Sequence, residues 1–202
     1  PVTLIVGARY AEWEGESWAS AGGSDSQQQE EIVPYGGLVY DINDTWSAFA
    51  SYTAVFLPQS YRDDAGRVLE PVIGKNYETG IKAAWFDGLL YASFSVFRIE
   101  QDNVAEADPL EPGDTVTTYH AAQGVVSEGF DFEISGAVSD NLDLTFGLTH
   151  YTATDKNGAY NTDRPRTQAN FFSSYRVPQW SKLTVGGGFN WFSDTFVDGL
   201  AS

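Results

Sequence analysis

The chain offers few residues that could carry catalytic chemistry, and they are not grouped as an enzyme needs them. The two histidines, His120 and His150, lie far apart in the sequence. The adjacent acids Glu30-Glu31 and Asp63-Asp64 would point to opposite sides of an extended chain, so neither pair suits general acid–base catalysis. We therefore predict that the protein is not an enzyme and has no catalytic residue.

Phosphate and metal chemistry are no better supported. Gly186-Gly187-Gly188 lies inside a predicted strand with no helix after it, so it is not a phosphate-binding loop. Asp155, Asn157 and Gly158 resemble part of a calcium-binding turn, but the distal Glu of such a loop is missing. The chain contains no Cys, which excludes disulfides and Cys-ligated metals. We predict no metal site and no cofactor bound by the protein itself.

Charge and hydropathy narrow the class of protein further. The 202 residues carry a formal net charge of -17 at pH 7, which argues against a nucleic-acid partner because phosphate binding needs a basic surface. No run of apolar residues approaches the roughly 18 that a membrane-spanning helix needs. Strands of a membrane β-barrel stay possible, because their apolar and polar residues alternate and the hydropathy averages out.

Alternation of apolar and polar side chains is the dominant pattern. In residues 76 to 86, one face holds Tyr77, Thr79, Ile81, Ala83 and Trp85, and the other holds Glu78, Gly80, Lys82 and Ala84. The same pattern occurs at 3–13, 46–56, 128–138, 142–149 and 182–191, and more weakly at 32–40, 89–100 and 167–177. This period is typical of half-buried strands. We predict an all-β, antiparallel fold of about nine strands without helices.

The lengths of strands and connections favour a transmembrane β-barrel over a soluble β fold. The predicted strands are about 9 to 13 residues long, against roughly 5 to 6 in soluble proteins and roughly 9 to 11 for a tilted membrane crossing. Long connections (14–31, 58–75, 102–123 and 155–166) alternate with short turns (41–45, 87–88, 139–141 and 178–181). Long loops on one side and short turns on the other are the arrangement of outer-membrane barrels.

Two further features indicate one sector of a larger barrel. Trp46, Trp85 and Trp180 lie beside three of the short turns, as expected for an aromatic girdle at one membrane interface. Bacterial single-chain barrels have an even number of strands, and an open sheet in lipid would leave two unpaired edges. About nine strands therefore do not complete a barrel.

The order of several motifs gives the sequence a family resemblance. Pro34-Tyr35, Pro58-Gln59, Asn76-Tyr77-Glu78 and Gly80-Ile81-Lys82 follow one another, and then come "SEGFDFEISGAV", "THYTATDKNG" and "RPRTQANFFSSYRVPQWSKLTVGGGFNW". In this order and spacing the sequence resembles the middle of the barrel of TonB-dependent ferric-siderophore receptors, in the branch of the ferripyoverdine and ferric-coprogen receptors. The resemblance covers nearly the whole chain.

The resemblance implies that residues 1–202 are a partial β-barrel domain, contributing about nine strands to a barrel of about 22. The N-terminal plug and the final strands lie outside this sequence. It also implies contact with outer-membrane lipid in a Gram-negative bacterium and uptake of a ferric siderophore. TonB would engage the N-terminal region that this sequence lacks. The iron travels inside its chelate, so the receptor supplies no metal ligand and needs no cofactor.

The resemblance places the short turns at the periplasm and the long loops outside the cell. A large ferric chelate is held by aromatic faces and hydrogen-bond donors at the rim of a cavity, and loops carry such residues most often. The candidate ligand-binding residues are Trp13, Trp18, Tyr61, Arg62, Tyr119, Tyr160, Arg164 and Arg166.

Charged residues on the polar strand faces have two possible uses. They are Arg9, Glu78, Lys82, Asp131, Glu133 and Arg176. We expect them to pair across strands, with contact to the plug as the second possibility.

Two other functions stay open at this point. A passive porin or channel section would share the strand pattern but would lack a plug and a TonB-contacting segment. A soluble acidic β-sandwich that binds carbohydrate through loop aromatics would stay folded without detergent.

Overall fold

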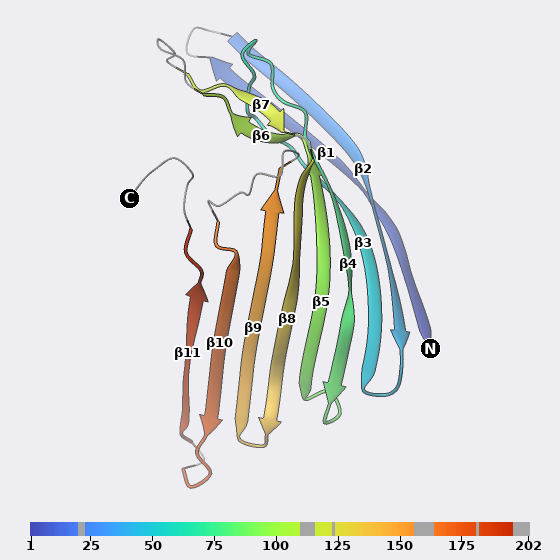
Figure 1. The fold of residues 1–202 in the computed structure, drawn as a ribbon, viewed down its shortest axis with the longest axis vertical. Coiled ribbons are helices and arrows are strands. Elements are labelled where there is room, and N and C mark those ends of the chain that lie inside the picture. Colours follow the sequence, from blue (N-terminus) through green and yellow to red (C-terminus); the bar gives the residue numbers. More distant parts are fainter. Residues whose placement is uncertain (20–22, 110–115, 123, 156–163, 181, 196–202) are drawn as a thin grey trace.

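The computed structural model describes residues 1–19, 23–109, 116–122, 124–155, 164–180 and 182–195. Figure 1 shows a single broad sheet whose strands run side by side, with a small hairpin at its upper end. The large sheet has nine strands in the order β1-β2-β3-β4-β5-β8-β9-β10-β11, and the hairpin is a separate two-stranded sheet, β6-β7. All neighbouring pairs are antiparallel. The prediction of an antiparallel, all-β fold is confirmed.

The strands of the large sheet are long. They are β1 (Val2–Ala19), β2 (Gly23–Asp41), β3 (Trp46–Leu57), β4 (Val72–Trp85), β5 (Leu90–Asp102), β8 (Val125–Ser139), β9 (Leu142–Thr154), β10 (Thr167–Arg176) and β11 (Thr184–Phe192). The hairpin consists of β6 (Val104–Ala107) and β7 (Tyr119–Ala122). Along the described residues no helix is long and apolar enough to cross a membrane.

Strand register assigns the side chains to two faces. Tyr52 lies opposite Tyr77, and Ser51 lies opposite Glu78. Apolar residues of neighbouring strands therefore share one face of the sheet, and polar residues share the other. We call the face with Tyr52, Tyr77 and Trp85 the outer face, and the face with Ser51, Glu78 and Lys82 the inner face. A one-residue slip between any two strands would exchange these faces.

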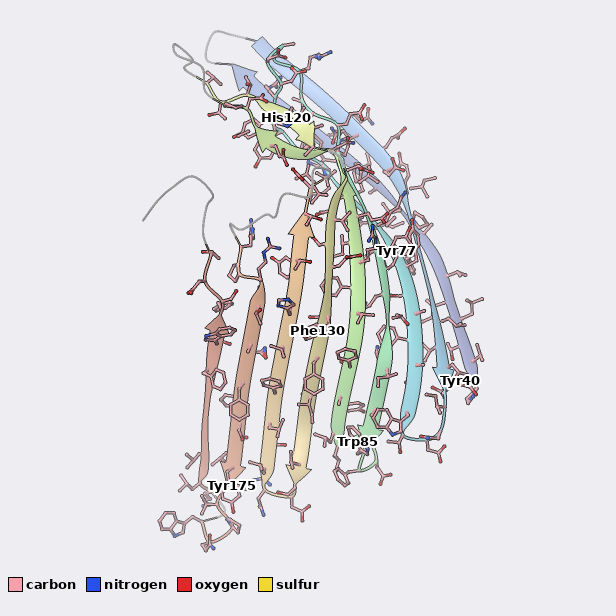
Figure 2. All side chains as sticks on the ribbon, viewed as in Figure 1. Tyr40, Tyr77, Trp85, His120, Phe130 and Tyr175 are labelled. Carbon is pink, nitrogen blue, oxygen red and sulfur yellow. The ribbon has the colours of Figure 1, made fainter. Side chains whose placement is uncertain are left out.

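The outer face is apolar and carries pairs of aromatic rings between neighbouring strands. The ring centroids are 5.5 Å apart for Trp46 and Trp85, 5.3 Å for Tyr52 and Tyr77, 6.1 Å for Phe94 and Phe130, 6.0 Å for Phe132 and Phe146, and 5.7 Å for Phe171 and Phe189. Figure 2 places Tyr40, Trp85 and Tyr175 near the lower end of the sheet and Tyr77 and Phe130 higher up.

This apolar face has no protein layer over it within the described residues. Ile81, Phe94 and Val96 are each more than 40% exposed, and no large side chain in the described part of the chain is fully buried. A water-soluble sandwich would cover such a face with a second sheet. An uncovered apolar face of this extent is what a lipid-facing sheet requires.

Aromatic rings on the inner face lie over glycines of the neighbouring strand. A Cβ atom at Gly80 would come within 2.8 Å of the Phe49 ring, and one at Gly129 within 2.8 Å of the Phe97 ring. Each glycine thus makes room for a ring from the strand beside it, and the ring covers backbone that the glycine leaves bare. These contacts fix neighbouring strands without adding bulk to the inner face.

Two predicted loops contain more regular structure than the sequence pattern indicated. Residues 14–31, predicted as a long loop, are largely strand, because β1 and β2 stay paired from Val2↔Tyr40 to Ala19↔Gly23. Residues 102–123 contain the β6-β7 hairpin. Polar and acidic residues obscured both pairings, since a strand that extends into water need not alternate in hydropathy.

The close packing at Gly80 gives a testable expectation. Gly80→Ala would push a methyl group against the Phe94 carbonyl and the Phe49 ring, so we expect it to reduce the free energy of unfolding by about 1–3 kcal/mol. Gly187→Ala is the matched control, because a Cβ there meets no atom within 4 Å, and its effect should stay within about 0.5 kcal/mol. Denaturant unfolding followed by tryptophan fluorescence measures both, and equal midpoints would contradict this packing.

Candidate functional site

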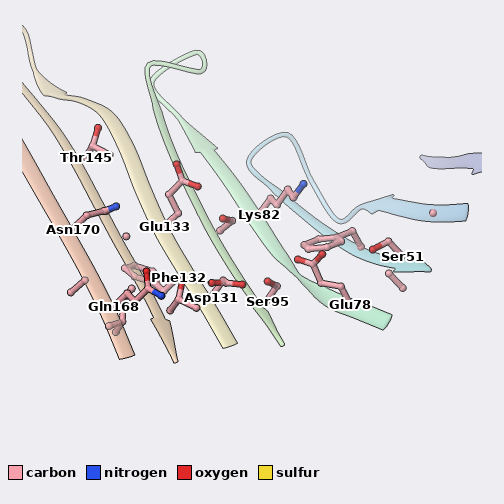
Figure 3. Close-up of a pocket in the computed structure, with 18 of the residues that line it drawn as sticks. Ser51, Glu78, Lys82, Ser95, Asp131, Phe132, Glu133, Thr145, Gln168 and Asn170 are labelled. Carbon is pink, nitrogen blue, oxygen red and sulfur yellow. Dashed lines mark hydrogen bonds between the residues drawn. The ribbon is translucent and has the colours of Figure 1, made fainter. Parts of the chain in front are cut away.

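The inner face of the sheet is hollowed. The hollow has a volume of about 840 Å³ and draws its lining from strands across the sheet, including Ser51, Glu78, Ser95, Asp131 and Asn170. Figure 3 shows these polar side chains standing on successive strands along the inner face. The volume is in the range of small-molecule sites, but the hollow is broad and open along its length. It is suited to a large occupant.

Acidic groups of the inner face have no basic partners among the described residues of that face. No ion pair joins Arg9, Glu78, Lys82, Asp131, Glu133 and Arg176 to one another, so the expected cross-strand pairing is wrong. Lys82 lies over the Phe49 ring, with its Nζ atom 4.5 Å from the centroid. The Thr149 hydroxyl donates to Asp131 over 2.5 Å. The hollow thus keeps an excess of negative charge.

Above the hollow, residues 58–71 form a compact loop with its own short hairpin. Arg62 and Val68 pair as an isolated β-bridge, and the amide of Gly66 donates to the Asp63 carbonyl over 3.0 Å. Arg67 closes the tip, because its amide and Nε both donate to the Asp63 carboxylate, over 2.8 and 2.9 Å. Gly66 takes a positive φ of 76°, which glycine adopts without strain.

Three of the predicted ligand-binding residues meet where this loop contacts the β6-β7 hairpin. The Tyr61 and Tyr119 ring centroids are 4.6 Å apart. The Tyr119 amide donates to the Arg62 carbonyl over 2.9 Å, and the Arg62 guanidinium donates to the Gly66 carbonyl over 2.7 Å. The tyrosines are separated by 58 positions in the sequence but form one aromatic surface, which we call the tyrosine platform (Tyr61, Arg62 and Tyr119).

The other candidates lie elsewhere. Arg166 lies between β9 and β10, where its guanidinium carbon is 6.0 Å from the centroid of the Tyr151 ring and its amide donates to Ser193. Trp13 lies on the inner face of β1 against Gly15, and Arg164 is exposed just before β10. Trp18 belongs to β1, but its side chain lies outside the described residues, as does the whole of Tyr160.

Sequence reasoning missed the residues that hold the platform together. Gln59 is buried, and its Nε2 donates to the carbonyls of Glu70 and, over 2.8 Å, of Asn103. On the hairpin, the two ring nitrogens of His120 face Asp108 at 2.7 Å and Glu106 at 3.4 Å. His120 lies in the hairpin at the top of Figure 2. The Pro58-Gln59 pair was the one sequence feature that pointed to this position. A single polar residue in a predicted loop, however, does not indicate that its side chain is buried.

The chain is similar to known outer-membrane receptors. A family model described as TonB dependent receptor-like, beta-barrel matches residues 1–201. The ferripyoverdine receptor of Pseudomonas aeruginosa is 40% identical over 174 residues, covering 82% of this chain and 21% of that protein. The ferric-pyoverdine BN7/BN8 receptor of Pseudomonas putida is 35% identical over 206 residues, covering 98% of this chain and 25% of that protein. The chain thus spans about a quarter of the length of these relatives.

Solved structures show the same arrangement of strands. The alcaligin outer-membrane receptor of Bordetella pertussis superposes with a TM-score of 0.80 at 38% identity, covering 96% of this chain and 35% of that one. The ferripyoverdine receptor of P. aeruginosa, crystallised with ferripyoverdine, superposes with a TM-score of 0.79 at 34% identity, covering 96% and 26%.

The Asp63–Arg67 contact predicts a pH dependence of the loop tip. Desolvation raises the pKa of Asp63, but the hydrogen bonds and charge of Arg67 outweigh it, so the pKa falls below its ordinary value of 3.8. A folded-state pKa below the unfolded value means that the contact stabilises the tip above pH 3.8 and loses this effect as the pH drops further.

Amide hydrogen exchange of residues 60–70, corrected for intrinsic rates, measures this effect. We expect protection to fall about twofold to fivefold between pH 6 and pH 3, because surface ion pairs contribute little. Asp63→Asn should already be less protected at pH 6 and should lack the pH dependence. A variant with the same pH profile as the parent would contradict the assignment.

Proposed function

The chain belongs to the TonB-dependent receptor β-barrel family, and from this premise we propose that the protein takes up a ferric siderophore across the outer membrane. Members of this family are transport receptors of the Gram-negative outer membrane and not enzymes. The chain supplies one sector of the receptor, and the binding and transport that we propose belong to the whole protein.

The observation that carries this proposal is the tyrosine platform above a polar hollow. Tyr61 and Tyr119 present adjoining rings, and the next residue of the loop, Arg62, carries a guanidinium that donates to the Gly66 carbonyl over 2.7 Å. Aromatic faces provide contact area at low cost in conformational entropy, and a guanidinium donates hydrogen bonds to the oxygen atoms of a chelate. The similar proteins include a ferric-pyoverdine receptor and an alcaligin receptor, which supports a ligand of the same chemical class.

We place the iron inside the ligand and not on the protein. A ferric siderophore fills the coordination sphere of its metal, so the receptor recognises the organic shell. In the described residues no group of three or more His, Asp or Glu side chains is arranged to hold a metal ion. Iron is cargo in this proposal, and Tyr61, Arg62, Tyr119 and Arg166 are groups that contact the chelate.

We further propose that the nine-stranded sheet is part of a closed barrel of about 22 strands. Within the described residues, strands β1 and β11 each pair with one other strand, and in lipid the edges left open there must be paired by further strands. An N-terminal plug would occupy the hollow, where Glu78, Asp131 and Glu133 leave negative charge for basic groups to match. TonB would act on the receptor through that N-terminal region.

Neither alternative function gains support. The uncovered apolar outer face is unsuited to a soluble carbohydrate-binding sandwich. A passive porin needs no paired loops above its lumen, whereas residues 58–71 and β6-β7 are joined through the Tyr119 amide and the Arg62 carbonyl.

Iron-restricted growth tests the proposed uptake directly. A strain that lacks the full-length receptor, and any other receptor for the same chelate, should fail to grow on one ferric siderophore and should grow normally on free iron. The intact gene should restore growth, and a gene lacking the TonB-contacting segment should not. Growth of the deletion strain on every siderophore tested, in a background without redundant receptors, would contradict the proposal.

Substitutions in the platform test the binding site separately. Tyr61→Ala and Tyr119→Ala should each weaken binding of that siderophore about tenfold, because truncation removes one ring of the pair. Tyr175→Ala is the matched control, since Tyr175 lies at the opposite end of the sheet near Leu142. Fluorescence quenching of the purified full-length receptor gives the affinities, and equal affinities for all three variants would remove the platform from the site.

A further inference from the structure

A buried glutamine lies at the base of the loop that carries Tyr61. Gln59 is only 8% exposed, and Gln59 and Ser95 are the buried polar residues of the described chain. A buried amide is tolerated when its hydrogen bonds are made. Gln59 Nε2 makes two, to the Glu70 carbonyl at the far end of the same loop and to the Asn103 carbonyl 44 positions away.

Asn103 in turn donates a hydrogen bond back to the loop that carries Gln59. Its side-chain amide donates to the Pro71 carbonyl over 3.1 Å, while its backbone has a φ of 64°. Among residues other than glycine, Asn is one of the few that adopt this left-handed conformation readily. The two amides therefore tie both ends of loop 58–71 to the point where β5 ends and β6 begins. We call this group the amide junction (Gln59, Glu70, Pro71 and Asn103).

The β6-β7 hairpin branches from the large sheet at this junction. Asn103 redirects the chain from β5 into β6, and Gly124, with a φ of 73°, returns it into β8. The Gly124 amide donates to the Asp102 carboxylate over 3.1 Å, which closes the base of the hairpin. Figure 1 shows the hairpin turned away from the line of β5 and β8. The direction in which it leaves the sheet decides where Tyr119 lies.

Two contacts in the described part of the chain join the hairpin to the loop, and the junction at the base of both segments holds them in line. They are the Tyr119 amide to the Arg62 carbonyl at 2.9 Å and the Tyr61–Tyr119 ring pair at 4.6 Å. The ring pair is exposed to water on one side, since Tyr61 is 48% exposed. Partly exposed contacts of this kind break easily unless both partners are held.

We propose that Gln59 is a positioning residue that holds hairpin β6-β7 against loop 58–71, so that Tyr61, Arg62 and Tyr119 act as one surface. Without its two donors, the Glu70 and Asn103 carbonyls lose their partner inside the protein, and the hairpin is free to move away from the loop. The alignment of the two segments is a property of the unliganded protein. Its effect on siderophore binding rests on the proposed function.

Amide hydrogen exchange of the unliganded full-length protein tests the alignment without any ligand. Gln59→Leu keeps the size of the side chain but removes its donors, and Gln59→Glu keeps its shape but presents a carboxylate to two carbonyls. Both should lower the protection of the Tyr119 amide, measured in residues 116–122, about tenfold. Ser60→Ala, at the exposed neighbouring position, is the control and should leave protection unchanged.

Protection of the β4 and β5 amides from hydrogen exchange shows whether each variant is folded. If Gln59→Leu does not fold, Gln59→Glu carries the same test, because it also removes the side-chain amide that donates to the Glu70 and Asn103 carbonyls. Loss of protection at 116–122 with β4 and β5 unchanged is the expected result. Unchanged protection at 116–122 in a folded variant would overturn the proposal.

A binding cycle then connects the alignment to the proposed function. In the Gln59→Leu background, Tyr119→Ala should have little further effect on siderophore affinity, because the platform is already disrupted. Fully additive effects would show that Gln59 does not act through Tyr119 and would overturn the positioning role. Absence of siderophore binding by the parent receptor would refute the proposed function alone, since the exchange result does not depend on it.

Discussion

The structure depends on one constraint. In a sheet that faces lipid, every backbone N–H and C=O group must find its hydrogen-bond partner within the sheet. Lipid offers no hydrogen-bond partner, so each strand must bond to a neighbour along its whole membrane-spanning length. The paired strands from β1 to β11, joined through β5 and β8, meet this requirement, with one register shift between Ala137 and Ser139 of β8. Fixing the register also fixes the face of each side chain, so the apolar outer face and the polar inner face follow from one set of backbone bonds.

On our proposal that the outer face contacts lipid, side chains of that face mark the two edges of the lipid layer. Trp46 and Trp85 pack edge to face beside the short turns, and Tyr52 and Tyr77 pair about 6 to 8 residues further along the strands, or roughly 20 to 26 Å. Opposite Tyr77 lies Arg98, which forms ion pairs with Glu100 and Glu128 on the same face. Two aromatic belts about 25 Å apart followed by charge match the band of an outer-membrane barrel.

Period-two alternation predicted the strands and their faces, because each is a local property of the sequence. Alternation could not show that Tyr61 and Tyr119 share one surface. Their contact depends on the direction in which the chain leaves β5 at Asn103, and a pattern of apolar and polar residues does not indicate a left-handed backbone conformation. It also missed the paired upper ends of β1 and β2, where both strands run in water and polar residues are tolerated. The expected ion pairs of Glu78, Asp131 and Glu133 did not form, because their inner-face neighbours across the strands include the small or polar Ser51, Ser95 and Gly147. These misses all concern contacts between distant segments.

A spin-label scan of β5 can establish whether its even-numbered residues face lipid and its odd-numbered residues face the lumen. Single labels from Leu90 to Asp102 in the full-length protein in lipid vesicles would report collision with oxygen and with a water-soluble nickel chelate. We expect high oxygen accessibility at Ala92, Phe94 and Val96, low values at Ser93, Ser95 and Phe97, and a change to water accessibility at Arg98. Absence of the period of two, or its reversal, would contradict the assignment of faces and with it the position of the binding surface.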